Sequence, residues 1–246
     1  MRNELWSSFH DRLTNEFGSL DQDLSQYQYD PVGYCRKFFG WEPWSGTEAE
    51  PGQLQIVEAY VLALRQMHER LAFQAGELSL EELQYWQPGE IIKNRIRVEA
   101  GHGVGKTKGA DLLVNHFFDC FIPSIIYAFA PNEEQIHDLL FKEIKDDRRN
   151  SGLPGRILDL ELFRSDSHFV KGKATDNAHG SGTERVQGQH NKYLMFVLDE
   201  AEGIADFVWG AIDSMASGGI CIVLMLANPK TRNMNSGFGR RMVPAG

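Results

Sequence analysis

Apolar residues in the first third of the chain recur every three to four positions, a spacing that predicts α-helices. The clearest example is residues 53–71, where one side of a helix would carry an apolar stripe. Residues 41–52 lack this period and are expected to form a loop. The other predicted helices cover residues 3–18, 31–40 and 79–86, the last of them ended by Pro88-Gly89.

From residue 91 onward, short apolar runs are separated by helical segments. Runs that are apolar throughout indicate strands buried on both faces, as in parallel sheets covered by helices. We therefore expect an α/β fold: a mostly parallel central sheet flanked by helices, with an N-terminal helical extension. The expected strands are 91–99, 124–130, 193–198 and 220–226, the expected helices are 106–118, 133–149 and 206–216, residues 157–170 are expected to form a β-hairpin, and the polar, glycine-rich residues 171–191 a loop.

The composition, with 42% hydrophobic and 24% charged residues, is that of an ordinary globular protein. Its 246 residues allow one large domain, or one domain with a small appendage. No apolar run approaches the roughly 20 residues that span a bilayer, so we expect no membrane partner. The net charge of −9 disfavours a general nucleic-acid binder, so any contact with DNA would need a local basic patch or another domain. The three cysteines, Cys35, Cys120 and Cys221, lie far apart and indicate neither a disulfide framework nor a zinc site.

A glycine-rich turn lies between the predicted strand 91–99 and the predicted helix 106–118. Glycines allow backbone N–H groups to converge on phosphate oxygens, and the helix N-terminus adds positive potential. Lys106 would reach the β- and γ-phosphates of ATP, and Thr107 would ligate Mg²⁺. A chance glycine-rich turn is the alternative, and the first glycine of the usual pattern is replaced by Ala100. The residues expected to bind the nucleotide here are Gly101, His102, Gly103, Val104, Gly105, Lys106 and Thr107.

Two carboxylates directly follow the predicted strand 193–198. Asp199 would hold Mg²⁺, directly or through water, and Glu200 would orient and polarise an attacking water. A solvated acidic loop after a core strand is the alternative. The preceding phosphate-binding pattern favours the catalytic interpretation.

Asn228-Pro229 follows the last predicted strand. A polar residue at the tip of a neighbouring strand can sense the γ-phosphate, which assigns that role to Asn228. Asn-Pro is also a common turn dipeptide, so a plain turn is the alternative.

The glycine-rich turn, the carboxylate pair and Asn228-Pro229 follow one another in this order along the chain. With their flanking strands and helices, they resemble the motifs of the terminase large subunits of tailed bacteriophages. The resemblance covers about residues 41–240. It identifies Ala100–Thr107 as a variant Walker A motif, Asp199-Glu200-Ala201 as a Walker B motif and Leu226–Pro229 as a coupling motif, with Ala227 where glycine is usual. Residues 128–132 with Gln135, and residues 187–190, are also similar to the family's pattern.

The resemblance also implies roles for single residues. Gln53 begins a segment similar to the one that recognises adenine, with a helix residue that contacts no ligand as the alternative. His102 stands where many relatives place an arginine, and we expect a loop residue near phosphate rather than a catalyst. The stretch between Gln53 and the glycine-rich turn is longer than the family pattern predicts, so residues 67–89 are interpreted as an insertion.

Arg185 is the candidate for an arginine that completes the catalytic site of a neighbouring subunit. It lies just ahead of the Walker B strand, where the family's candidate tends to lie, but a solvated loop arginine is the alternative. Arg164, Arg148 and Arg149 are rivals, and the last two are interpreted as charges that cap a helix end.

The resemblance implies a P-loop ATPase of the ASCE type that drives double-stranded DNA into a procapsid. Its implied partners are double-stranded DNA, the portal protein, the small terminase subunit and copies of itself in a ring, with a monomer in isolation, and its implied location is the host cytoplasm. We expect an N-terminal extension over residues 1–50 and the ATPase domain over residues 51–246. The family's nuclease domain would follow, so no nuclease activity is expected from this chain, and acidic runs such as Asp146-Asp147 and Glu81-Glu82 are interpreted as solvated helix faces.

The sequence leaves two other classes of function as alternatives. A helicase-like or host-defence P-loop ATPase is disfavoured by the coupling motif, the Gln53 segment and the lack of a second lobe. A nucleotide-binding assembly scaffold is disfavoured because it would not need Glu200 to activate water.

Overall fold

The computed structural model describes residues 24–47, 52–101, 103–175, 191–216 and 219–228. Its centre is a seven-stranded sheet with the order β1-β7-β6-β2-β5-β4-β3. The first five strands in this order are parallel, and β4 and β3 extend the sheet as antiparallel strands. The strands are β1 (Arg95–Glu99), β2 (Ser124–Ala130), β3 (Arg156–Ile157), β4 (Glu161–Ser165), β5 (His168–Ala174), β6 (Tyr193–Leu198) and β7 (Ile220–Ala227).

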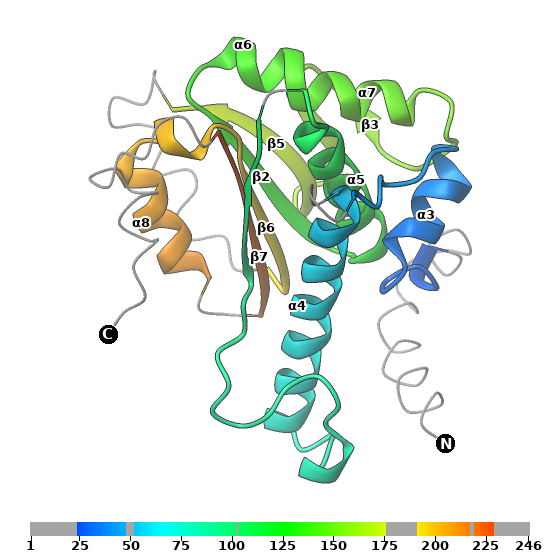
Figure 1. Ribbon diagram of the computed structural model, residues 1–246, viewed down its shortest axis with the longest axis vertical. Coiled ribbons are helices and arrows are strands. Elements are labelled where there is room, and N and C mark those ends of the chain that lie inside the picture. Colours follow the sequence, from blue (N-terminus) through cyan, green and yellow to red (C-terminus); the bar gives the residue numbers. More distant parts are fainter. Residues whose placement is uncertain (1–23, 48–51, 102, 176–190, 217–218, 229–246) are drawn as a thin grey trace.

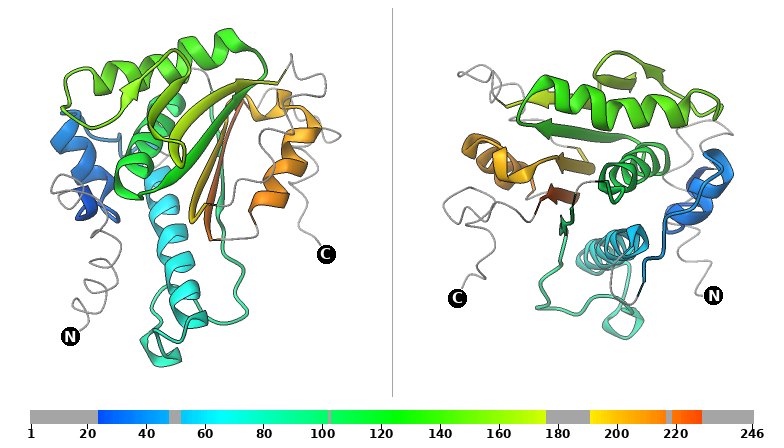
Figure 2. Two further views of the ribbon diagram at one scale, coloured as in Figure 1. Left: turned by 180° about the vertical axis from the view of Figure 1, so that it is seen from behind. Right: turned by 45° about the horizontal axis from the view of Figure 1, so that its top comes forward.

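Helices cover both faces of this sheet, as Figures 1 and 2 show. On one face lie α3, α4, α5 and the run α6–η2–α7, and on the other lies α8. The predicted α/β class with a mostly parallel sheet is therefore confirmed. The helices are α3 (Pro31–Phe38), α4 (Gln53–Gln74), α5 (Lys106–Cys120), α6 (Glu133–Gln135), the π-helix η2 (Ile136–Phe141), α7 (Lys142–Arg148) and α8 (Asp206–Met215), with two short 3₁₀ turns, η1 (Leu80–Glu82) and η3 (Ala201–Gly203).

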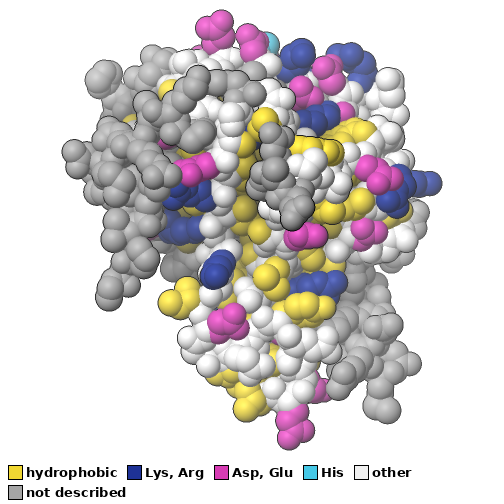
Figure 3. Space-filling view, viewed as in Figure 1, with side chains coloured by type: hydrophobic (Ala, Val, Ile, Leu, Met, Phe, Trp, Pro, Cys, Tyr) yellow, Lys and Arg dark blue, Asp and Glu magenta, His cyan; other side chains and the backbone are white. Residues whose placement is uncertain are grey.

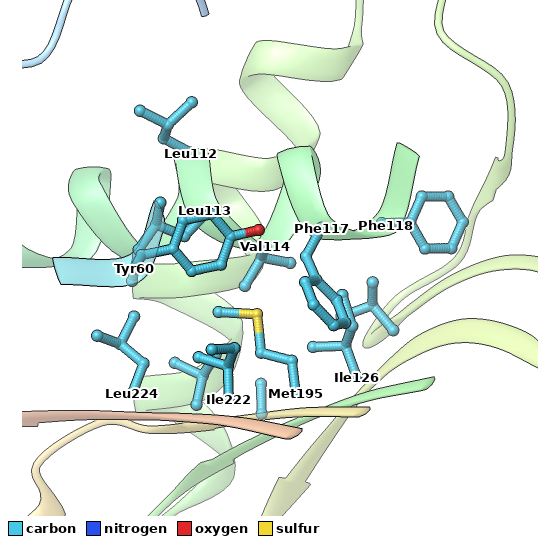
Figure 4. Close-up of a cluster of buried hydrophobic side chains, with 14 of the residues drawn as sticks. Tyr60, Leu112, Leu113, Val114, Phe117, Phe118, Ile126, Met195, Ile222 and Leu224 are labelled. Carbon is cyan, nitrogen blue, oxygen red and sulfur yellow. The ribbon is translucent and has the colours of Figure 1, made fainter. Parts of the chain in front are cut away.

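Side chains on the two faces of the central strands pack into two separate hydrophobic cores. Strand residues such as Met195 and Ile222 face α5, where they meet Tyr60 and Phe117 from the helices (Figure 4). Their neighbours in sequence, such as Phe196, face α8. Burial on both faces explains why β2, β6 and β7 are almost entirely apolar and why their limits were predicted to within one residue.

Three local predictions were wrong. Strand β1 begins only at Arg95, and Ile91 is 86% exposed. The predicted helix 79–86 is reduced to a single 3₁₀ turn, because the Glu69 carboxylate accepts the backbone N–H groups of residues 84, 85 and 86. Residues 171–174 belong to β5 and pair with β2, rather than starting a loop.

The other predicted helices are largely confirmed, with one internal change. The run 133–149 is helical to Arg148, but a π-helix interrupts it. The predicted helix 3–18 lies outside the described residues. In the described part of the chain, no helix has both the length and the apolar character that a membrane span requires.

A buried polar network, which the sequence did not reveal, fixes α5 against α7 and α3. Arg148 is not a capping charge on the surface. It pairs with Asp119 at 2.9 Å, and both side chains are almost fully buried. Asp147 is not solvated either, because it accepts bonds from Lys108 at 2.7 Å and from the Trp41 ring N–H at 2.9 Å. The network therefore anchors α5 at both ends, at its first turn through Lys108 and at its last turn through Asp119.

Candidate functional site

The polar residues predicted from the motifs gather where β1, β7 and β6 end. The register pairs Glu99 with Ala227 and Leu198 with Met225, so these three parallel strands end at the same edge of the sheet. The residues that follow them therefore meet there. This edge carries Lys106, Asp199, Glu200 and Asn228, each close to a strand end.

Lys106, the first residue of α5, turns its ammonium group back into the glycine-rich loop. It donates hydrogen bonds to the backbone oxygens of Ala100 and Gly101 and, at 2.7 Å, to the side-chain oxygen of Asn228. Burial lowers the pKa of Lys106, and the negative charges of Asp199, Glu202 and Glu200 oppose that shift. The loop thus surrounds a partly buried cation with oxygen acceptors that a phosphate could replace.

Two glycines of the loop adopt backbone angles that other residues avoid. Gly103 and Gly105 have φ values of 79° and 81°, in the left-handed region. At Gly105 a Cβ would also lie 2.5 Å from the amide nitrogen of Gln53. A side chain at this position would therefore strain the backbone and displace Gln53.

Gln53, the first residue of α4, forms hydrogen bonds to the glycine-rich loop and to the loop that precedes α4. Its amide nitrogen donates to the Gly105 oxygen at 2.8 Å, and its amide oxygen accepts the Trp44 N–H at 3.0 Å. Next to it lies a cavity of about 310 Å³, a volume within the range of small-molecule sites. Gln53, Ile56, Val98, Val104 and Lys106 are among the residues that line it.

Asp199 is buried with one carboxylate oxygen unpaired. Its Oδ1 accepts the Glu200 N–H at 3.0 Å, while Oδ2 is buried without a hydrogen-bond partner in the described chain. Desolvation by burial raises the pKa of this carboxyl group. A buried oxygen without a partner is costly unless it receives a cation or a donor. The arrangement therefore fits a magnesium ligand.

The described residues hold no group of three or more His, Cys, Asp or Glu side chains arranged to bind a metal by themselves. Magnesium does not require such a group, because one or two protein ligands with substrate phosphates suffice. Thr107 lies in the first turn of α5, directly after Lys106. Asp199 and Thr107 are thus the side chains available for a nucleotide-bound Mg²⁺.

Glu200 is the one described non-glycine residue with a positive φ, at 45°. Its carboxylate accepts a hydrogen bond of 2.7 Å from the side-chain amide of Gln135, which ends α6. The next acidic residue, Glu202, accepts the Asn228 N–H at 2.7 Å. Sequence reasoning missed Glu202, although three carboxylates within four positions were a visible signal.

The structure therefore brings together Lys106, Asp199, Glu200 and Asn228 and places Gln53 against the loop. Thr107, Gly101, Gly103, Val104 and Gly105 lie in or beside the same loop. His102 and Arg185 lie outside the described residues.

No protein-family model matches the chain. A curated relative, "Probable terminase, large subunit" of Enterobacteria phage P7, is 25% identical over 157 residues, which are 58% of this chain and 32% of that protein. The chain is similar to phage terminase large subunits. It spans about a third of the length of this relative.

A solved terminase structure shares the fold. The HK97 bacteriophage large terminase aligns with a TM-score of 0.55 at 12% identity, over 86% of this chain and 39% of that one. The large terminase ATPase domain of Thermus phage P74-26 aligns with a TM-score of 0.44 at 20% identity, over 56% of this chain and 61% of that one. The terminase resemblance predicted from the motifs is thus confirmed by a sequence relative and, for the fold, by the HK97 structure.

Proposed function

We propose that this chain is the ATP-hydrolysing motor domain of a terminase large subunit, which couples hydrolysis to the movement of double-stranded DNA into a procapsid. The observation that carries the proposal is the meeting of Lys106 with Asn228, beside Asp199, at one edge of the sheet. A lysine at a glycine-rich helix start and a carboxylate at a strand end are the parts that phosphoryl transfer needs. The terminase relatives favour this function over a generic helicase or a scaffold.

The glycine-rich loop binds the triphosphate. Gly101, Gly103, Val104 and Gly105 present backbone N–H groups to the phosphates. Lys106 leaves its backbone acceptors and binds the β- and γ-phosphates. Thr107 and Asp199 would hold Mg²⁺, which would neutralise part of the phosphate charge. Gln53 contacts the adenine at the cavity beside the loop.

Glu200 acts as the general base. It orients a water and takes its proton as the water oxygen forms a bond to the γ-phosphorus. The bond from that phosphorus to the bridging oxygen breaks, and the oxygen leaves on ADP with the electron pair. Asn228 contacts the γ-phosphate, so the product ADP no longer offers it a partner.

The partners follow from the packaging function. The whole assembly contains double-stranded DNA, the portal protein, the small terminase subunit and further copies of this chain in a ring, within the host cytoplasm. Basic and acidic side chains are interspersed on the face in Figure 3, and the net charge is −9. The isolated chain is expected to be a monomer, as the terminase resemblance implies. It should bind DNA weakly, since phosphate contacts need clustered cations.

Arg185 completes the site of the neighbouring subunit by neutralising charge on its γ-phosphate. Arg185→Ala and Lys106→Ala would each inactivate the assembled motor. Mixed rings of the two variants would regain hydrolysis, because some intact loops then face an intact arginine. A lack of recovery in verified mixed rings contradicts a role in trans.

Lys106→Ala tests the site itself. Removing the ammonium should lower ATP turnover by about a hundredfold or more, because such contacts act on the transferring phosphoryl group. Lys37→Ala, which removes an exposed lysine in the last turn of α3, is the matched control. Unchanged turnover in folded Lys106→Ala protein would refute the assignment.

A further inference from the structure

Strand β7 continues beyond the end of its neighbour β6. Leu198, the last residue of β6, pairs with Met225, whereas β7 runs on to Ala227. Continuing this register would set Asn228 opposite Ala201, which already belongs to the turn η3. A backbone group of Asn228 that faces β6 therefore finds no strand partner there, and it needs another acceptor.

The Glu202 side chain supplies that acceptor. Successive backbone groups along a strand bond to opposite neighbours. The Ala227 oxygen accepts the Ala100 N–H at 3.2 Å, on the β1 side. The next N–H, that of Asn228, faces the β6 side, where the Glu202 carboxylate accepts it at 2.7 Å. Glu202 thus takes the place of the backbone oxygen that a longer β6 would offer.

The turn that carries Glu202 is firmly anchored. Its neighbours Ala201 and Ile204 are buried in the core beneath α8, with 0% and 4% exposure. The backbone of Gly203 lies so close to the loop after β2 that an added Cβ would be 2.8 Å from the Pro131 ring. The core and this close contact therefore fix the position from which Glu202 reaches Asn228.

The side chain of Asn228 reaches the glycine-rich loop. Its oxygen accepts a hydrogen bond from the Lys106 ammonium at 2.7 Å, while its backbone N–H is bonded to Glu202. A short side chain with staggered rotamers can reach only a few positions from a fixed backbone. The hydrogen bond to Glu202 therefore helps to determine where the Asn228 oxygen lies relative to Lys106.

We propose that Glu202 is a positioning residue for ATP hydrolysis: its carboxylate holds the Asn228 backbone so that the Asn228 side chain meets the γ-phosphate bound at Lys106. Glu202 itself contacts neither the nucleotide nor the attacking water. The inference rests on the proposed role of Asn228 at the γ-phosphate. It adds the residue through which the turn after β6 sets that role.

The test compares Glu202→Ala, which removes the acceptor, with Glu202→Gln, which keeps an acceptor oxygen and loses the charge. Steady-state ATP hydrolysis by the full chain gives kcat and KM, and titration gives the affinity for ADP. Glu202→Ala should lower kcat by roughly three- to tenfold, the value of one net hydrogen bond, and leave ADP affinity within about twofold. Glu202→Gln should recover most of that loss, because its amide oxygen still accepts the Asn228 N–H.

A double-mutant cycle separates positioning from a contribution to the fold. If Glu202 acts through the Asn228 side chain, Glu202→Ala should lower kcat no further in an Asn228→Ala background, because the side chain that it places is gone. Two independent contributions would instead multiply. Glu81→Ala, which changes an exposed glutamate in η1, is the matched control and should leave kcat unaltered.

Unchanged kcat in folded Glu202→Ala protein overturns the proposal, as do losses that multiply in the double variant. Equal losses in Glu202→Ala and Glu202→Gln also overturn it, because they assign the effect to the charge of Glu202. If Glu202→Ala does not fold, Glu202→Gln decides, since a loss as large as that of Asn228→Ala contradicts the proposal. A wild-type chain without Lys106-dependent hydrolysis would instead refute the proposed function, so the Lys106→Ala comparison distinguishes the two failures.

Discussion

The Lys106 ammonium lies 2.7 Å from the side-chain oxygen of Asn228, so the first residue of α5 is joined to the residue that follows β7. Asn228 thus offers Lys106 an oxygen acceptor of the kind that a phosphate would also provide. The backbone N–H of Asn228 is bonded in turn to Glu202, two residues after Glu200. A phosphate bound at Lys106 would therefore compete with the Lys106–Asn228 hydrogen bond. Through Asn228 this bond is linked to Glu202, in the acidic segment that follows β6.

Asn228→Ala should slow ATP hydrolysis while leaving the affinity for ADP nearly unchanged. If Asn228 contacts the γ-phosphate, its removal lowers kcat by about tenfold, the value of a hydrogen bond to a charged group, and changes ADP affinity little. Steady-state kinetics and ADP titration measure the two effects. Asn150→Ala, in an exposed turn, is the control. Equal losses of ATP and ADP binding would show that Asn228 only shapes the loop.

Glu200→Gln should bind ATP but hydrolyse it at least about a hundredfold more slowly, since the amide keeps the shape and loses the base. Single-turnover hydrolysis and nucleotide titration separate the two steps. Glu202→Gln, which alters a carboxylate bonded to the Asn228 backbone, should slow hydrolysis less. If Glu200→Gln loses ATP binding to the same extent as turnover, Glu200 is a structural residue or a metal ligand.

Asp199→Asn should stabilise the nucleotide-free protein while abolishing Mg²⁺-dependent turnover. The buried Oδ2 has no partner in the described chain. Replacing the charged carboxylate with an uncharged amide should therefore raise the free energy of unfolding by about 1 kcal/mol. Urea unfolding at neutral pH measures this gain. Loss of stability in Asp199→Asn would show that the carboxylate is satisfied in the free protein.

The raised pKa of Asp199 also predicts a pH effect of definite sign. Burial makes the folded state hold this proton more tightly than the unfolded chain does. The penalty that the charged Asp199 imposes on the wild-type protein therefore shrinks as pH falls through the folded pKa. The stability difference between Asp199→Asn and wild type should narrow at acid pH, while Mg²⁺–ATP binding weakens.

The sequence predicted the central strands and the position of the glycine-rich loop because their signals are local. Buried strands such as β6 are apolar at every position, and glycines with a following Gly-Lys-Thr mark the loop. The end of β5 was missed because Lys171 and Lys173 are polar. Their strand identity comes from pairing with β2, which no local pattern reveals.

The polar contacts that set the geometry are equally non-local. Gln135 meets Glu200 across 65 positions, and Lys106 meets Asn228 across 122. Arg148 was interpreted as a charge that caps a helix end. Its burial depends on Asp119, 29 positions away, whose carboxylate it pairs with. Such pairings become visible only when the fold brings the helices together.

His116 gives a stability test that is independent of catalysis. Its ring lies fully buried between Tyr60, whose hydroxyl is 2.9 Å from Nδ1, and the Tyr27 backbone oxygen, 2.7 Å from Nε2. Because a carbonyl only accepts, Nε2 carries the proton and Nδ1 accepts from Tyr60. The ring is therefore held neutral, and burial lowers the pKa of His116 from its usual 6.5 to about 4.

The neutral ring predicts that the protein loses stability as pH falls from about 6.5 toward 4. In this window the unfolded chain binds a proton that the folded protein excludes, so acid favours unfolding, with a total effect on the order of 3 kcal/mol. Urea unfolding at pH 7, 6 and 5 should show the decline, and His116→Gln should flatten it. His137→Gln is the control, because His137 is exposed and its pKa is raised through the hydrogen bond to Asp138, which gives the opposite sign. An equal decline in His116→Gln would assign the acid sensitivity to other groups.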